Sequence, residues 1–219
     1  MSEDRTRATR HLYATVAPTY AEVLPDTRYE APLDLGMVDH FIACLPDSEL
    51  PVLDAGCGTG RMLEYLSARG IRNLAGCDLS PEMLAYARAG HPAVALEVAD
   101  LRELPYADAS IRAILCWYAI IHSTKSEVAA IVDEARRVLA PGGTLLLGFQ
   151  AGTGEREVER AYGHDVTLHG VLHETHEIAH LLSDAGFDVT ATARRASVGI
   201  ERHGQGFVLA RRRPAAQTG

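Results

Sequence analysis

The chain has 219 residues, of which 47% are hydrophobic and 23% are charged. This length fits one compact domain, and the composition excludes a collagen-like chain, a coiled coil and a low-complexity tail. The 21 Lys and Arg against 29 Asp and Glu give a formal net charge of -8. Such a charge disfavours nucleic acid as a partner, because binding to the phosphate backbone needs many cationic contacts.

No apolar run reaches the length of a membrane span, and charged residues stand near the N-terminus where a signal peptide would carry its apolar core. We therefore expect a cytoplasmic protein without a membrane partner. The four cysteines form no CxxC pair, so we expect buried reduced thiols rather than disulfides or zinc ligands. They are Cys44, Cys57, Cys77 and Cys116.

The first 45 residues, 1–45, predict a helical lid: an amphipathic helix broken near Pro18, then a second helix from Pro32 to Leu45. From 46 to 150, short apolar strands alternate with glycine turns and amphipathic helices, which is typical of a parallel α/β sheet. The strands are expected at 51–55, 73–78, 94–98, 111–117 and 143–149, and the helices start after Gly60, at Pro81 with Ser80 as N-cap, and at Glu127.

Residues 151–175 contain glycines without a sustained period, and we expect a lid loop on the acceptor side. Residues 176–213 return to a helix followed by an antiparallel strand pair at 187–193 and 206–210. No internal repeat or linker divides the chain, so 1–219 is expected to be a single domain.

The stretch Asp54-Ala55-Gly56-Cys57-Gly58-Thr59-Gly60 runs from a strand end through a glycine turn into a helix. Such a turn places backbone N–H groups at a helix N-terminus, where a polar or negatively charged ligand group is favoured. Asp78 ends the next strand, twenty residues beyond Gly58, where a carboxylate can accept both hydroxyls of a ribose. The turn and the acid together predict a nucleoside-containing ligand at the carboxyl edge of the sheet.

The spacing argues against a dinucleotide. The GxGxxG fingerprint would put its third glycine where Arg61 stands, so the pattern of an NAD-dependent oxidoreductase fails by one residue. Asp54 would also repel a pyrophosphate, whereas it would favour an ammonium or sulfonium group.

These residues resemble the first motif of the class I S-adenosylmethionine-dependent methyltransferases, an acidic residue followed by GxGxG. Three further segments look like later motifs of that family, in the right order: 76–84, 99–101 and 137–143. The resemblance extends over 52–149, roughly half of the chain. One GxGxG would be a weak signal, but four ordered motifs are specific.

The resemblance implies a Rossmann-like class I methyltransferase fold: a mostly parallel seven-stranded sheet with an antiparallel last strand and helices on both faces. It implies S-adenosyl-L-methionine as cofactor and S-adenosyl-L-homocysteine as product. The turn would contact the methionine moiety, Asp78 the ribose, Asp100 the adenine amino group, and Cys116 the region of the methyl group. The implied cofactor-binding residues are Asp54, Gly56, Cys57, Gly58, Gly60, Asp78, Leu79, Met83, Asp100, Leu101 and Cys116.

Simpler interpretations stay open for the acids. Asp54 can cap the turn, Asp78 can shape the turn before Ser80, and Asp100 can form an Asx turn.

On the acceptor side, the resemblance places Trp117, Tyr118 and His122 toward the substrate. His122 is the first candidate for a general base because it follows the fourth strand at the active edge, and His164 in the expected lid loop is the second. A neutral nitrogen or an activated carbon acceptor would need no base.

Three more residues are candidate substrate contacts. Tyr13 and Tyr20 lie in a segment that looks like the lid helix of small-molecule members, with core packing as the alternative. Arg195 is a candidate for holding an acceptor carboxylate bidentately, with an exposed strand-end arginine as the alternative.

The segment His176-Glu177-Ile178-Ala179-His180 spells the HExxH motif of zinc proteases. A helix with Ile178, Leu181 and Leu182 toward the sheet would instead leave both histidines in solvent, and no third ligand is evident. We expect no catalytic metal, although the histidine-rich segment 164–180 leaves adventitious binding open.

The sequence therefore predicts methyl transfer to an oxygen, nitrogen or carbon of a small-molecule acceptor, a natural product or metabolite, by a monomer or homodimer. The alternatives are a protein that binds S-adenosylmethionine for other chemistry and one that only binds it.

Overall fold

The computed structural model describes residues 2–199 and 201–214. Its helices are α1 (Ser2–Val23), α2 (Pro32–Ala43), α3 (Arg61–Ala68), α4 (Pro81–Gly90), α5 (Lys125–Val138) and α6 (Thr175–Asp184). Its strands are β1 (Val52–Ala55), β2 (Leu74–Asp78), β3 (Ala95–Val98), β4 (Ile111–Trp117), β5 (Leu139–Ala151), β6 (Glu155–Ala161), β7 (His164–Val171), β8 (Phe187–Arg195) and β9 (Gly204–Arg212).

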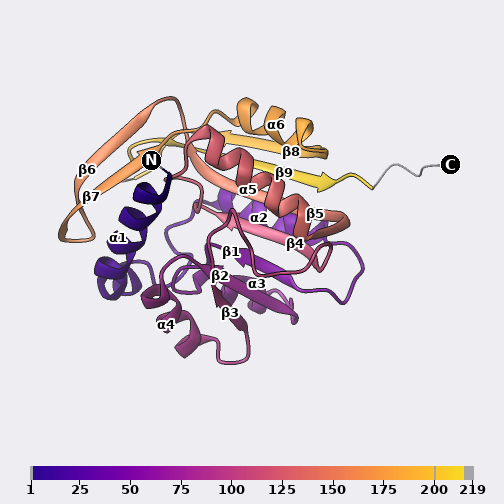
Figure 1. The fold of residues 1–219 in the computed structure, drawn as a ribbon, viewed down its shortest axis with the longest axis horizontal. Coiled ribbons are helices and arrows are strands. Elements are labelled where there is room, and N and C mark those ends of the chain that lie inside the picture. Colours follow the sequence, from indigo (N-terminus) through magenta and orange to yellow (C-terminus); the bar gives the residue numbers. More distant parts are fainter. Residues whose placement is uncertain (1, 200, 215–219) are drawn as a thin grey trace.

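Within the described residues, seven strands form the main sheet in the order β3-β2-β1-β4-β5-β9-β8 (Figure 1). The pairs from β3 to β5 are parallel, and β9 runs antiparallel to both β5 and β8. The predicted fold class is confirmed. Because the first five strands run in the same direction, their carboxyl ends meet at one edge of the sheet, where α/β folds bind ligands.

The central strands are buried on both faces because helices cover both sides of the sheet. On β1, Val52 packs in an apolar cluster with Phe41 of α2 and Leu66 of α3. The next residue, Leu53, points to the other face and belongs to the cluster of Ile131 on α5. This alternation fixes the strand, so that Asp54 at its end is held in a defined direction.

Helix and strand starts follow local chemistry. The hydroxyl of Ser80 caps α4 by accepting from the Met83 N–H at 3.2 Å, as expected. Helix α5 starts at Lys125, before the predicted Glu127, because Thr124 and Glu127 form a capping box. Strand β5 starts at Leu139 rather than after the glycine turn, with a register shift opposite β4.

The prediction of a break near Pro18 is wrong. Pro18 lies inside α1, which is one helix of 22 residues. A proline removes one backbone donor, but Leu12, Val16 and Ala17 are buried in the turns directly before it. Helix α1 also packs against α4 and β7, and these contacts hold it as one helix.

The expected lid loop is also corrected, because most of it is a hairpin of β6 and β7 beside α1 (Figure 1). Its two-residue turn is Tyr162-Gly163, with φ values of 52° and 83°, which is the type I′ geometry that matches strand twist. The glycines suggested a loop, whereas Val166 and Leu168 alternate with polar residues in β7, which is the period of a strand.

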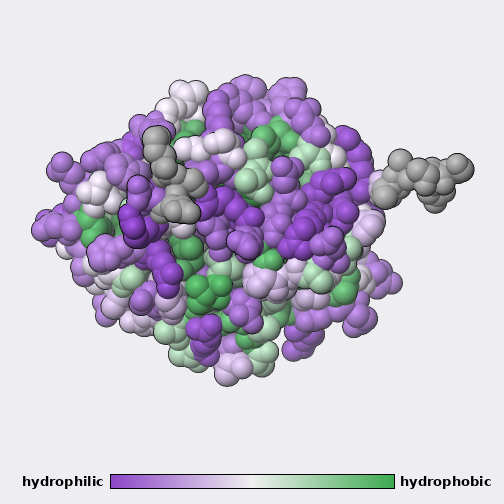
Figure 2. Space-filling model, viewed as in Figure 1, coloured by the Kyte–Doolittle hydropathy of each residue, from purple (hydrophilic) through white to green (hydrophobic). Residues whose placement is uncertain are grey.

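The cysteine prediction is partly corrected. Cys57, Cys77 and Cys116 are buried free thiols, but Cys44, just after α2, is exposed. In the view of Figure 2, hydrophilic residues cover most of the face and apolar residues form small separate patches. None of the helices described is long and apolar enough to cross a bilayer.

Candidate active site

A cavity of about 320 Å³ lies at the carboxyl ends of the parallel strands, with α1 and the segment between α1 and α2 over it. This volume is in the range of small-molecule sites. The sequence-predicted residues that line it are Tyr13, Tyr20, Gly56, Gly58, Asp78, Leu79, Met83, Asp100, Leu101, Trp117, Tyr118 and His122. Those outside its lining are Asp54, Cys57, Gly60, Cys116, His164 and Arg195.

The glycine turn is built as its sequence requires. Gly56, Gly58 and Gly60 have φ values of 80°, 54° and 92°, in the left-handed region that favours glycine. A Cβ on Gly56 would lie 2.3 Å from the Cβ of Ala119. The Gly56 N–H donates to the Cys77 carbonyl at 2.8 Å, so the turn is tied to β2.

Asp78 is fixed by backbone groups. Its carboxylate accepts the Gly58 N–H at 2.8 Å and the Ser80 N–H at 2.9 Å. Burial raises the pKa of Asp78, and these N–H groups partly offset that effect. A carboxylate has about four acceptor positions, so Asp78 retains capacity for two hydroxyl donors from the cavity.

Asp54 differs from Asp78 and Asp100 because its carboxyl group is buried without a hydrogen-bond partner among the described residues. It is 1% exposed, and neither carboxylate oxygen has a hydrogen-bond partner among the described residues. Burial raises the pKa of Asp54 to about 8, and the negative charge of Asp78 adds to the effect. A buried carboxyl group without partners is costly unless a ligand completes it, and a cationic ligand fits it best.

Asp100 lines the cavity but is engaged by a neighbour. It accepts from the backbone N–H of Arg102 and from its Nε, both at 2.9 Å. Burial acts to raise the pKa of Asp100, but the hydrogen bonds from Arg102 outweigh it and the pKa is lowered. The carboxylate is therefore ionised and oriented, as an acceptor of an amino group needs to be.

Tyr13 and His122 form a hydrogen-bonded pair in the cavity. The Nδ1 of His122 lies 2.6 Å from the His169 carbonyl, which can only accept, so Nδ1 carries the proton. The Nε2 atom then accepts from the Tyr13 hydroxyl at 2.9 Å. Burial lowers the pKa of His122 to about 4 and raises that of Tyr13, so both side chains are neutral near pH 7.

Trp117 and Tyr118 form the wall after β4. Trp117 stacks on Phe207 at a centroid distance of 5.3 Å. Tyr118 has a φ of 57°, which non-glycine residues adopt rarely, and its N–H donates to the Gly148 carbonyl at 2.8 Å. Strain of this kind clusters at functional sites.

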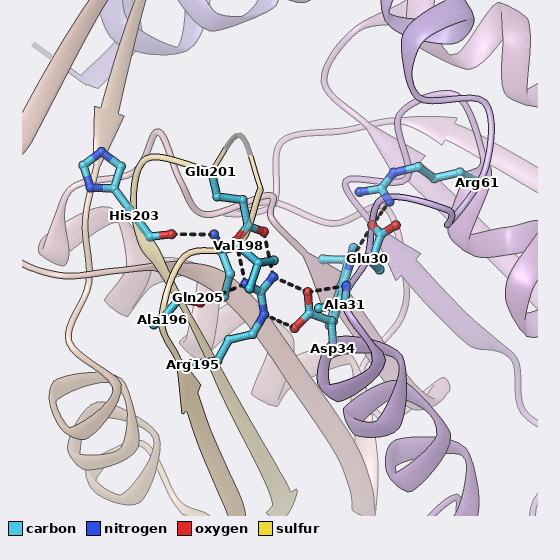
Figure 3. Close-up of polar contacts among 11 residues, drawn as sticks. Glu30, Ala31, Asp34, Arg61, Arg195, Ala196, Val198, Glu201, His203 and Gln205 are labelled. Atoms are coloured by element: carbon cyan, nitrogen blue, oxygen red, sulfur yellow. Dashed lines mark hydrogen bonds and ion pairs between the residues drawn. The ribbon is translucent and has the colours of Figure 1, made fainter.

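Figure 3 shows a charged network that sequence reasoning missed. The guanidinium of Arg195 donates to both oxygens of Asp34, at 2.6 and 2.5 Å, and to both oxygens of Glu201. Asp34 and Glu201 line the cavity with Gln205. These residues come from α2, from the segment after β8 and from β9, so no local pattern could join them.

The network corrects the prediction for Arg195. Its side chain is 9% exposed and its five donors are taken by Asp34, Glu201 and the Ala196 carbonyl. Arg195 therefore holds two acids of the cavity wall, and it has no donors to offer an acceptor carboxylate.

Two further predicted residues lie away from the main cavity. The Nε2 atom of His164 is hydrogen-bonded to the Thr19 hydroxyl at 3.0 Å, on the side of α1 that faces the hairpin. Cys116 faces a small apolar void between β4 and α5. Neither side chain reaches the cavity in this structure.

The HExxH segment forms α6 in the way the amphipathic pattern suggests. His176 and His180 are exposed, whereas Ile178 and Leu182 are buried. Glu177 pairs with Lys125 at 2.6 Å. In the part of the chain that the structure describes, no three His, Cys, Asp or Glu side chains are grouped to hold a metal ion.

The sequence and the fold of this chain are similar to those of known proteins. A family model described as a methyltransferase domain matches residues 52–143. This match, the relatives and the fold together support a class I S-adenosylmethionine-dependent methyltransferase. The family's cofactor, S-adenosylmethionine, fits the residues present, because the unpartnered Asp54 suits a cation and Asp78 lines the cavity with acceptor capacity left for hydroxyl groups.

The relatives are similar over part of their length. A malonyl-[acyl-carrier protein] O-methyltransferase of Pectobacterium atrosepticum is 32% identical over 148 residues, which are 67% of this chain and 56% of the relative. One of the same description from Erwinia pyrifoliae is 36% identical over 117 residues, 53% of this chain and 44% of the relative. The chain spans about half the length of the curated relatives it matches.

Two solved structures show the same fold at lower identity. A methyltransferase from Methanosarcina mazei has a TM-score of 0.71 at 16% identity, covering 85% of this chain and 99% of that one. CalS10, an amino pentose methyltransferase from Micromonospora echinaspora, has a TM-score of 0.60 at 24% identity, covering 81% and 89%.

Proposed function

We propose that this chain transfers a methyl group from S-adenosyl-L-methionine to an oxygen, nitrogen or carbon atom of a small-molecule acceptor. The observation that supports it is one cavity that runs from the glycine turn and Asp78 to the Tyr13–His122 pair. Its cofactor end matches the family motifs, and its acceptor end is lined by aromatic and charged side chains.

When bound, the cofactor supplies a methyl group on a positively charged sulfur. The chain's task is then to bind and orient, since holding two reactants in line removes much of the barrier. Asp78 would hold the ribose hydroxyls, Asp100 the adenine amino group, and Leu79 and Leu101 the adenine ring. Asp54 would face the positively charged part of the ligand.

The Tyr13–His122 pair is placed to take a proton from an acceptor. We propose that an acceptor O–H gives its proton to the Tyr13 oxygen while the Tyr13 proton passes to Nε2 of His122. The neutral Nε2 lone pair makes this possible, and the bond from Nδ1 to the His169 carbonyl would stabilise the resulting imidazolium.

The charges of the wall favour some acceptors over others. Around the network of Figure 3, Glu30, Asp34 and Glu201 outnumber Arg61 and Arg195 by one charge. Several of the matched relatives are named malonyl-[acyl-carrier protein] O-methyltransferases. Because Arg195 is already saturated, we propose that this chain's acceptor carries a hydroxyl or amine at the reacting end rather than a carboxylate.

The experiment is methyl transfer with isotopically labelled S-adenosylmethionine and mass spectrometry of the products. A producer-cell metabolite extract would be the acceptor source, followed by matched phenol, amine and carboxylate compounds on one scaffold. A labelled product from the phenol or amine supports the proposal. Tight cofactor binding without transfer to any of them would indicate a binding role or other chemistry, and preferred transfer to the carboxylate would contradict the acceptor class.

A further inference from the structure

Two glutamines stand side by side on the part of the cavity wall that β5 and β9 form. Gln150, near the end of β5, and Gln205, near the start of β9, are paired in the antiparallel register, and both line the main cavity. Residues opposite each other in such a pair point to the same face, with Cβ atoms about 4.5–5.5 Å apart, so the two amide groups are neighbours. Both lie outside the segment 52–149 that contains the cofactor motifs.

Gln205 presents a hydrogen-bond acceptor that has no partner. The residue is 3% exposed, and its carbonyl oxygen Oε1 forms no hydrogen bond among the described residues. Its amide nitrogen Nε2 donates to the His203 carbonyl at 3.0 Å, which fixes the amide plane and the direction of the oxygen (Figure 3). Buried polar groups are nearly always paired, so an unpaired acceptor at a cavity wall points to a donor on a ligand.

Gln150 and Tyr118 present the complementary groups. The oxygen of Gln150 accepts from Nη2 of Arg156 at 2.7 Å, which orients the amide, and its nitrogen has no partner in the part of the chain that the structure describes. The Tyr118 hydroxyl, on a residue that lines the same cavity, is also unpaired among those residues. Burial raises the pKa of Tyr118, so the hydroxyl keeps its proton near pH 7 and can donate as well as accept.

The charged side chains of this wall are engaged with one another. Arg195 is bound by both Asp34 and Glu201, so neutral groups are left to meet a ligand here (Figure 3). The neutral groups are one acceptor, one donor and one hydroxyl. A ligand hydroxyl donates and accepts through a single oxygen, and several hydroxyls on adjacent carbons would satisfy all three groups together.

We propose that Gln150, Gln205 and Tyr118 form a subsite for the hydroxyl groups of a sugar or other polyol portion of the acceptor. This portion is separate from the reacting group, which the Tyr13–His122 pair serves. The inference rests on the proposed function and narrows its acceptor to a polyhydroxylated small molecule, in which a phenol or amine carries a sugar. The three residues determine which acceptors bind and leave the cofactor site unchanged.

The test is isothermal titration calorimetry on the chain saturated with S-adenosylhomocysteine, using two kinds of phenol. The para-hydroxyphenyl glycosides of glucose, galactose and xylose carry sugar hydroxyls, whereas para-cyclohexyloxyphenol has a ring of similar size without them. At least one glycoside should bind about tenfold more tightly than the cyclohexyl ether, since each neutral hydrogen bond is worth roughly a factor of two to ten.

Substitutions assign this preference to the subsite. Gln205→Leu should weaken glycoside binding by roughly threefold to tenfold, with a smaller effect on the cyclohexyl ether. Tyr118→Phe, which removes only the hydroxyl, should act in the same direction. Thr192→Val is the matched control, because it removes a neutral polar group from an exposed site on β8, and it should change neither affinity.

Glycosides that bind no better than the cyclohexyl ether would overturn the subsite, as would equal losses for both kinds of phenol in Gln205→Leu. If Gln205→Leu does not fold, Gln150→Leu and Tyr118→Phe are measured in the same way, and the wild-type preference remains decisive. Failure of S-adenosylhomocysteine to bind would contradict the proposed function. Cofactor binding and methyl transfer without a preference for glycosides would contradict this inference alone.

Discussion

The two ends of the cavity are held together by different means. At the cofactor end, backbone groups from nearby segments fix Asp78, which accepts N–H bonds from Gly58 and Ser80. At the acceptor end, side chains from distant segments hold each other, as Tyr13 and His122 do across 109 positions. Backbone contacts survive most substitutions, whereas side-chain contacts change with a single residue. The cofactor end is therefore suited to stay constant while the acceptor end changes specificity.

Gly56→Ala should give the largest effect, because it breaks the backbone frame of the cofactor end. The added Cβ meets Ala119 at 2.3 Å, and φ is 80°. Left-handed strain and overpacking together cost about 2–5 kcal/mol, so cofactor binding should be lost in calorimetry. Gly70→Ala is the matched control. Gly70 has a φ of 88° with open space around it, so cofactor affinity should be retained. Equal affinity of both variants would show that the turn is not the binding element.

Tyr13→Phe should affect the acceptor end alone. It removes the hydroxyl that donates to His122 and keeps the ring. With an O–H acceptor, kcat should fall by roughly a hundredfold, the scale of general acid–base catalysis, whereas cofactor affinity should not change. Steady-state kinetics and calorimetry on the same preparation separate the two. An unchanged kcat with a hydroxyl acceptor would remove the pair from the proton path.

Asp78→Ala should weaken cofactor binding by roughly 1–3 kcal/mol, the loss when buried polar groups go unpaired. The same substitution at Asp188, an exposed acid on β8, should have no effect on binding. Both affinities are measured with S-adenosylhomocysteine. Binding by Asp78→Ala equal to that of the wild type would exclude Asp78 from the ribose site.

Asp54→Asn should give the smallest effect, visible as a change in pH dependence. Asp54 has a pKa of about 8 in the folded chain against 3.8 in the reference state. Below pH 3.8 Asp54 is protonated in both states and costs the folded state nothing. Between pH 3.8 and about 8 the unfolded chain is ionised while the folded chain is still protonated, so the free energy of unfolding falls as the pH rises. The neutral Asn avoids that cost. At pH 8 it should raise Tm by about 4–8 °C, the shift that ~2 kcal/mol gives in a domain of this size.

The affinity for the cofactor should change with pH in the opposite direction from the stability, again because of Asp54. A cationic ligand favours the ionised Asp54, so wild-type affinity should rise between about pH 6.5 and 8.5 with release of a proton, and Asp54→Asn should lose that dependence. Melting curves and calorimetry in buffers of different ionisation enthalpy measure both. A wild-type Tm that follows the Asn variant at every pH would contradict the buried charge.

The sequence was informative where chemistry is local. The glycine turn, Asp78 and the Ser80 cap each depend on neighbours in the chain, and their motifs predicted the sheet, the cofactor end and the helix starts. Arg195 was misassigned because its partner Asp34 lies 161 positions away. The hairpin was missed because glycine frequency outweighed the short apolar–polar alternation around Val166 and Leu168.

Strand β9 lies between β5 and β8, so the last strand that the structure describes fills an interior place in the sheet. During synthesis β5 must leave the ribosome with one edge unpaired, and β8 has no neighbour until Gly204–Arg212 has emerged. An open strand edge invites pairing with other chains. Pairing of β9 completes the sheet and brings Gln205 to the cavity wall in the same step, so the cavity of a nascent chain is incomplete until β9 has paired.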